Sequence, residues 1–90
     1  MEKREESNSD SELERYLGNA IRDLRQKHGL TIADVAERAS ISRGMLSKIE
    51  NGQTATSLDT LSKLSQALGI SLSTLFKGYK IPEGNTQRLG

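Results

Sequence analysis

The sequence predicts an all-α domain of five helices around one core. Apolar residues recur every three or four positions in five successive segments, which is the spacing of one face of an α-helix. A glycine follows four of these segments, at positions 29, 52, 69 and 78, and glycine readily takes the left-handed conformation that often ends a helix. No segment alternates apolar and polar residues as a strand would. The glycines and the spacing of the apolar residues therefore both predict helices.

The composition suits one small helical domain. Hydrophobic residues make up 33% of the 90, with one Phe, two Tyr and no Trp, so Leu, Ile and Ala must fill the core. The absence of cysteine excludes a disulfide framework. No run approaches the roughly 18 apolar residues of a membrane span, and the charged N-terminus lacks the apolar core of a signal peptide. We expect a cytoplasmic protein.

The first helix is expected over residues 11–28. Residues 1–10 are polar or charged apart from Met1 and predict a disordered acidic arm. Ser11 and Glu14 then have capping-box spacing, which satisfies free amides of a first helical turn. An apolar stripe follows, formed by Leu13, Leu17, Ala20, Ile21 and Leu24.

Two short helices, 31–38 and 42–51, are expected next, joined by a tight corner. Thr31 and Ser42 are their N-caps, because a hydroxyl oxygen there accepts an amide of the first turn. Packing positions recur at Val35, Ala36, Ala39, Ile41, Leu46 and Ile49. The second helix keeps a polar face of small groups and cations, the chemistry that reads base edges in a major groove. This segment predicts a helix-turn-helix.

Two further helices, 57–68 and 71–77, complete the predicted domain over residues 11–79. Ser57 or Thr56 caps the first of them and Ser71 caps the second. Their apolar positions are Leu58, Leu61, Leu64, Ala67 and Leu68, followed by Leu72, Leu75 and Phe76. Residues 80–90 hold the only proline and little apolar content, so they predict a tail or linker.

The charge is unevenly distributed. Residues 1–15 hold six acids and three bases, a net charge of −3, whereas residues 16–90 hold ten bases and six acids, a net charge of +4. Affinity for a polyanion depends on where the cations lie, so the overall charge of +1 does not exclude nucleic acid. An ordinary solvated surface is the alternative.

These pieces together resemble the Cro and lambda-repressor-like helix-turn-helix family, the XRE class of bacterial and phage regulators. The resemblance rests on residues 17–31, 41–52 and 57–76, in the family's order and spacing. It implies a five-helix lambda-repressor-like DNA-binding domain. Three residues depart from the family's usual Gln, Gly and Pro, namely Ile32, Ser40 and Thr56. Since serine tolerates a positive φ poorly, Ser40 predicts a strained corner or a different turn.

The resemblance places base contacts on the helix over 42–51, at Arg43, Gly44, Met45 and Lys48. A guanidinium can donate two hydrogen bonds to O6 and N7 of guanine. Gly44 would let the backbone approach the bases, and Met45 can touch a thymine methyl. Each has an alternative role. Arg43 and Lys48 could be solvated or bound only to phosphate. Gly44 could be a locally tolerated helix defect, and Met45 could pack at the edge of the core.

Short polar groups and helix N-termini are the expected phosphate contacts, which fix register without reading sequence. The candidates are Thr31, Ser42, Ser47, Asn51, Gln53, Thr54 and Thr56. For Thr31 and Ser42, capping alone is a sufficient role. In similar domains an arginine of the first helix bonds an acid at the end of the recognition helix, which implies a structural ion pair between Arg25 and Glu50.

No catalytic site, metal site or cofactor is expected. His28 has no cysteine or second histidine to share a metal, and the segment GNTQRLG lacks the Lys-Ser/Thr of a phosphate loop. We therefore expect a non-enzymatic domain.

The family implies a transcriptional regulator, expected to be a repressor, whose partner is double-stranded DNA. It would act as a homodimer on a palindromic operator with half-sites about 34 Å apart. Dimer contacts are expected from the last two helices, including Leu75, Phe76 and Tyr79, or from a segment beyond the sequence. Members often carry a C-terminal effector domain. The alternative is a protein-interaction or antitoxin-type module that uses the same fold, with DNA binding secondary.

Overall fold

The structure, a computed structural model, describes residues 2–79, and for residues 2–11 the backbone alone. Five α-helices and no strand occur in this range, which confirms the predicted fold class. The last four helices begin and end within one residue of the predicted positions. The helices are α1 (Glu2–Lys27), α2 (Ile32–Ala39), α3 (Arg43–Glu50), α4 (Leu58–Leu68) and α5 (Leu72–Phe76). The expected tail, residues 80–90, lies outside the described residues.

The start of α1 differs from the expectation. The helix begins at Glu2, nine residues before Ser11, and includes the segment expected to be a disordered arm. Residues 2–17 contain no Gly or Pro and several Glu, Lys and Arg, which are good helix formers. Because adding a turn to an existing helix needs no new nucleus, α1 can extend through this stretch. No described helix, α1 included, is both long and apolar enough to cross a membrane.

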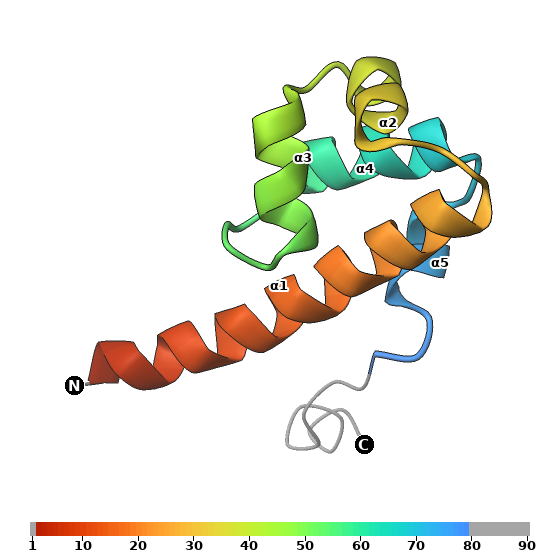
Figure 1. Ribbon diagram of the computed structural model, residues 1–90. Coiled ribbons are helices and arrows are strands. Elements are labelled where there is room, and N and C mark those ends of the chain that lie inside the picture. The colour runs from red at the N-terminus through yellow and green to blue at the C-terminus, as the bar shows by residue number, and fades with distance from the viewer. Residues whose placement is uncertain (1, 80–90) are drawn as a thin grey trace.

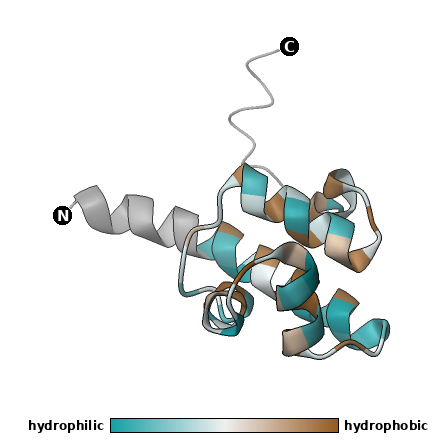
Figure 2. Ribbon diagram, turned by 90° about the horizontal axis from the view of Figure 1, so that it is seen from above, coloured by the Kyte–Doolittle hydropathy of each residue, from teal (hydrophilic) through white to brown (hydrophobic). Residues whose placement is uncertain are grey.

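A single hydrophobic core joins all five helices. Figure 2 shows hydrophobic and hydrophilic bands alternating along the helices, as helices with one inward face require. Leu75 is fully buried within the domain, so it fills the core and is not available for the dimer contact expected of it. The buried apolar residues are Leu17, Ile21, Val35, Ala36, Ala39, Leu46, Ile49, Leu61, Leu64, Leu68 and Leu75.

Among the other helices, α1 packs against α3, α4 and α5 (Figure 1). α2 packs on α4 and α3, and α1 runs across α3 and α4 and contacts α5 near its own C-terminal end. The α2–α3 connection lies on the opposite side of the domain from α1 (Figure 1). This arrangement holds α3 between the core and solvent.

Gly18 allows α1 to cross the C-terminal end of α3 at close range. A Cβ at this position would lie 2.3 Å from the carbonyl oxygen of Ile49 and 2.7 Å from that of Glu50. Both are backbone atoms of α3 and its last turn, so they cannot move aside as a flexible side chain would. The crossing point of the two helices therefore depends on this glycine.

The corner between α2 and α3 contains the strained serine. Ser40 has φ 59° and ψ 42°, and it is the only non-glycine residue with a positive φ among those described. Its N–H donates to Glu37 O at 3.2 Å, and the N–H of Ile41 donates to Ala36 O at 2.9 Å, so the helix ends as a Schellman motif. The left-handed conformation costs an L-residue roughly 1–2 kcal/mol.

Candidate nucleic-acid interface

One face of α3 is exposed. Leu46, Ile49 and Glu50 are buried, which follows from their three- and four-residue spacing. The opposite side carries the four residues predicted to contact bases, and Ser47 lies half-buried at its edge. We call the four residues together the α3 face: Arg43, Gly44, Met45 and Lys48, all exposed, with Met45 43% exposed.

Gly44 is not required by the packing of the domain. A Cβ at this position would meet no atom within 4 Å, in contrast to Gly18. Glycine within a helix costs roughly 1 kcal/mol relative to alanine. The domain thus carries a small cost at Gly44 that no contact within the described residues explains, as is common where another molecule approaches the backbone.

Thr31 and Ser42 are exposed N-caps, as the sequence predicts. The Ser42 Oγ accepts from the Met45 N–H at 3.0 Å. The Thr31 Oγ1 accepts from the Asp34 N–H at 3.0 Å, and Asp34 Oδ2 accepts from the Thr31 N–H at 2.9 Å. The Thr31 N–H, and secondly its hydroxyl, lower the pKa of the Asp34 carboxyl. The Ser42 hydroxyl uses a lone pair in capping, so its proton remains available to an acceptor.

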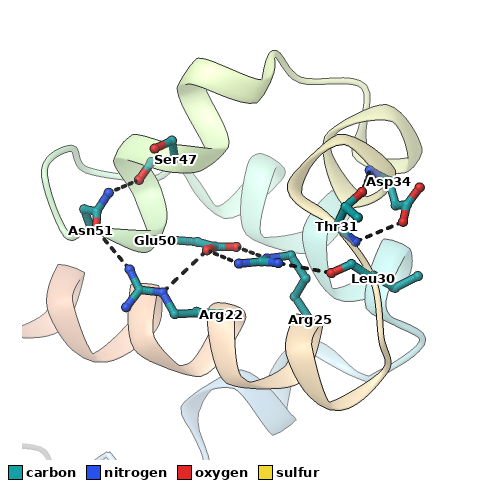
Figure 3. A network of polar contacts seen from close by, with 8 residues as sticks. All are labelled: Arg22, Arg25, Leu30, Thr31, Asp34, Ser47, Glu50 and Asn51. Carbon is teal, nitrogen blue, oxygen red and sulfur yellow. Dashed lines mark hydrogen bonds and ion pairs between the residues drawn. The ribbon is translucent and has the colours of Figure 1, made fainter.

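The structure brings Arg25 of α1 and Glu50 of α3 together (Figure 3). Arg25 Nε and Nη2 donate to the two carboxylate oxygens at 2.7 and 3.0 Å, and Nη1 donates to Leu30 O at 3.0 Å. Glu50 is only 3% exposed. Its hydrogen bonds raise the pKa of the Arg25 guanidinium. The pair fixes the C-terminal end of α3 to α1.

Arg22, which sequence reasoning passed over, joins the same network. Its Nη2 donates to Asn51 Oδ1 at 2.9 Å, and its Nε lies 3.7 Å from Glu50 Oε1. The Asn51 Nδ2 donates to Ser47 O at 2.9 Å (Figure 3). Arg22 precedes Arg25 by three residues and so lies on the same side of α1, a spacing that could have suggested it.

The remaining predicted phosphate contacts lie in the loop between α3 and α4. Gln53 is exposed, whereas Thr54 and Thr56 are half-buried. Thr56 lines a shallow hollow against α1, together with Leu13, Glu14, Leu17 and Ala55. Within residues 2–79 as described, no group of three His, Asp or Glu side chains gathers as a metal site would require.

Comparison with known proteins matches a helix-turn-helix family model (HTH_3) to residues 21–75. The chain is 43% identical over 64 residues to the HTH-type transcriptional regulator DdrOP3 of Deinococcus deserti, covering 71% of this chain and 50% of that protein. It is 31% identical over 72 residues to the antitoxin HipB of Escherichia coli, covering 80% of this chain and 82% of HipB. The chain thus spans half the length of the Deinococcus regulator.

Among solved structures, the clp gene regulator ClgR of Corynebacterium glutamicum superposes with a TM-score of 0.71 at 34% identity, over 72% of this chain and 69% of ClgR. These three proteins are named as two regulators and an antitoxin, which agrees with the expectation of a non-enzymatic domain. The family model covers more than half of the chain. The chain therefore belongs to the HTH_3 family of helix-turn-helix domains, the XRE or Cro/lambda-repressor-like class of transcriptional regulators.

Proposed function

We propose that this domain binds double-stranded DNA sequence-specifically, with α3 in the major groove. The α3 face carries this proposal, because Arg43, Gly44, Met45 and Lys48 lie together on the exposed side of a helix whose other side is held in the core. An α-helix fits the major groove, where a guanidinium reads guanine and an apolar side chain touches the thymine methyl. Gly44 would allow the backbone to approach the bases.

Phosphate contacts are proposed at both ends of the α3 face. At the N-terminal end, the Ser42 hydroxyl and the helix dipole favour an anion, and the first turn of α3 contains no acid. Thr31 is the weaker site, because the Asp34 carboxylate already occupies its N–H. At the other end, the candidates are Ser47, Asn51, Gln53, Thr54 and Thr56.

We propose further that the protein is a cytoplasmic repressor that acts as a homodimer. One domain covers only a few base pairs, so a palindrome with half-sites about 34 Å apart suits two copies. Phe76 and Tyr79 remain candidates for the dimer contact, because each, unlike Leu75, is partly exposed. Leu58, at the start of α4, is 65% exposed and adds apolar surface.

An antitoxin-type module that binds another protein is the second candidate function. The likeness to HipB over 80% of the chain favours it. DNA-binding measurements separate the two, because a domain that serves only a protein partner has no reason to prefer one duplex sequence.

The experiment that tests the proposal is selection of bound sequences from a random duplex pool, followed by Arg43→Ala. We expect a palindromic motif, and we expect Arg43→Ala to lose about 1–3 kcal/mol of discrimination at one position per half-site with a smaller loss on arbitrary sequences. Arg38→Ala, which removes a charge from exposed surface of α2, is the matched control. Equal loss on every sequence would make Arg43 a phosphate contact, and a pool without enrichment would overturn sequence specificity.

A further inference from the structure

Asn51 ends α3 and is tied on both sides of its amide. Its Oδ1 accepts from Arg22 Nη2 at 2.9 Å, and its Nδ2 donates to Ser47 O at 2.9 Å (Figure 3). The first bond comes from α1 and the second from α3 itself. Asn51 is exposed at the end of the α3 face, yet both its Oδ1 and its Nδ2 already make a hydrogen bond within the domain.

The chemistry of the two partners permits only one orientation of this amide. A guanidinium has donors and no acceptor, and a backbone carbonyl oxygen has no donor. A flipped amide would set its NH2 against Arg22 and its oxygen against Ser47 O, so both hydrogen bonds would be lost. With one hydrogen bond made by each atom, Oδ1 keeps one lone pair and Nδ2 keeps one N–H, and only the N–H can bind a group that accepts.

Arg22 is held mainly by Asn51. Its Nε lies 3.7 Å from Glu50 Oε1, a longer contact than the 2.7 and 3.0 Å hydrogen bonds that Arg25 makes to the same carboxylate. The Arg22 side chain is 38% exposed, whereas that of Arg25 is 12% exposed. Arg25 therefore neutralises the buried acid, and Arg22 is left to bond Asn51.

We propose that Arg22 is a positioning residue that holds Asn51 with a donor, and not an acceptor, facing a DNA phosphate. A phosphate oxygen can only accept, so an Asn51 amide free to turn would present its repelling oxygen part of the time. The inference rests on the proposed DNA binding and deepens it. The competing role for Arg22 is direct contact with a phosphate through its own charge.

A double-mutant cycle separates these roles. Duplex DNA of arbitrary sequence, about 20 base pairs long, is titrated with the wild type, Arg22→Ala, Asn51→Ala and the double variant at several salt concentrations. We expect Asn51→Ala to lose affinity on the order of tenfold, as for one hydrogen bond to a charged group. Arg22→Ala should lose less, because the Ser47 carbonyl still orients the amide, and the double variant should lose no more than Asn51→Ala. We also expect Arg22→Ala to leave the slope of log K against log salt unchanged.

Two results would overturn the inference. The first is losses that multiply in the double variant together with a slope smaller by about 0.9 per bound domain, about 1.8 for a dimer, which indicates a phosphate neutralised by Arg22 itself. The second is no loss of affinity in Arg22→Ala. Lys27→Ala, which removes a charge from the last turn of the same helix, is the matched control and should change affinity little. Melting curves of all variants show whether lost affinity reflects lost folding.

The side-chain amide of Asn51 in the free protein gives a readout that does not depend on DNA. Its NMR resonances should shift in Arg22→Ala and not in Lys27→Ala. Unchanged Asn51 resonances would overturn the positioning role alone. A wild type that binds no duplex at low salt would instead overturn the proposed function, and the phosphate contact with it.

Discussion

At the scale of single residues, Gly44 allows stability and binding to be separated. Since a Cβ meets nothing within 4 Å, Gly44→Ala should raise the free energy of unfolding by about 0.5–1 kcal/mol, because alanine is the better helix former. The same methyl group should weaken binding to the selected operator by keeping the backbone from the bases. Urea unfolding and operator titration measure the two effects.

The matched control for Gly44→Ala is Gln66→Ala, at an exposed position of α4. It should leave operator affinity unchanged. If Gly44→Ala binds the operator as tightly as the wild type, Gly44 is a tolerated helix defect and the backbone does not approach the bases there.

Ser40 provides a second prediction at this scale. Replacing it by glycine should raise the free energy of unfolding by about 1 kcal/mol, because glycine takes the left-handed conformation without the steric cost that serine has. Ser40→Ala, which also removes the hydroxyl but keeps a Cβ, should give no such gain. Denaturant unfolding of both variants checks this, and an equal gain in the two would show that the backbone strain is not the cause.

The residues that could be predicted from sequence are those whose role depends on near neighbours. Thr31 and Ser42 cap helices because their hydroxyls reach amides three residues on. Gly18 and Arg22 escaped prediction, since what makes each matter is a group of α3 or its end about thirty residues away. A mid-helix glycine and a surface arginine have no distinctive local pattern.

At the scale of elements, the angle between α1 and α3 depends on one buried acid. Glu50→Ala should cost about 3 kcal/mol or more of folding free energy, because it leaves the Arg25 guanidinium, 12% exposed, without its partner. Loosening α3 should also weaken DNA binding. Thermal unfolding and duplex titration are the measurements.

Glu37→Ala removes an acid from exposed surface of α2 and is the matched control for Glu50→Ala. It should change stability by less than about 0.5 kcal/mol. A melting temperature that is the same in Glu50→Ala and in the wild type would show that the ion pair does not hold the helix.

Helix bounds follow from sequence where both ends carry a signal. α3 begins after Ser42, which caps it, and ends with bonds from Gly52 and Gln53 to Ile49 and Lys48 carbonyls, so its predicted span lies within one residue of the observed one. α1 has no residue near Ser11 that would prevent the helix from extending toward the N-terminus. The capping-box spacing at Ser11 sits within a stretch without Gly or Pro, and the helix continues through it.

At the scale of the whole molecule, binding depends on where the charges lie. Arg43 and Lys48 are on the exposed α3 face, and the surplus acids fall in residues 1–15. A small overall charge is therefore compatible with affinity for a polyanion.

The salt dependence of duplex binding tests the central claim, that α3 docks this domain on DNA as a dimer. If a dimer neutralises about eight phosphates, log K should fall linearly with log salt with a slope near −7. Titration of labelled operator duplex at four or more salt concentrations gives the slope directly. A slope near −7 is the predicted result, and a flat dependence, or no binding at low salt, would contradict the account.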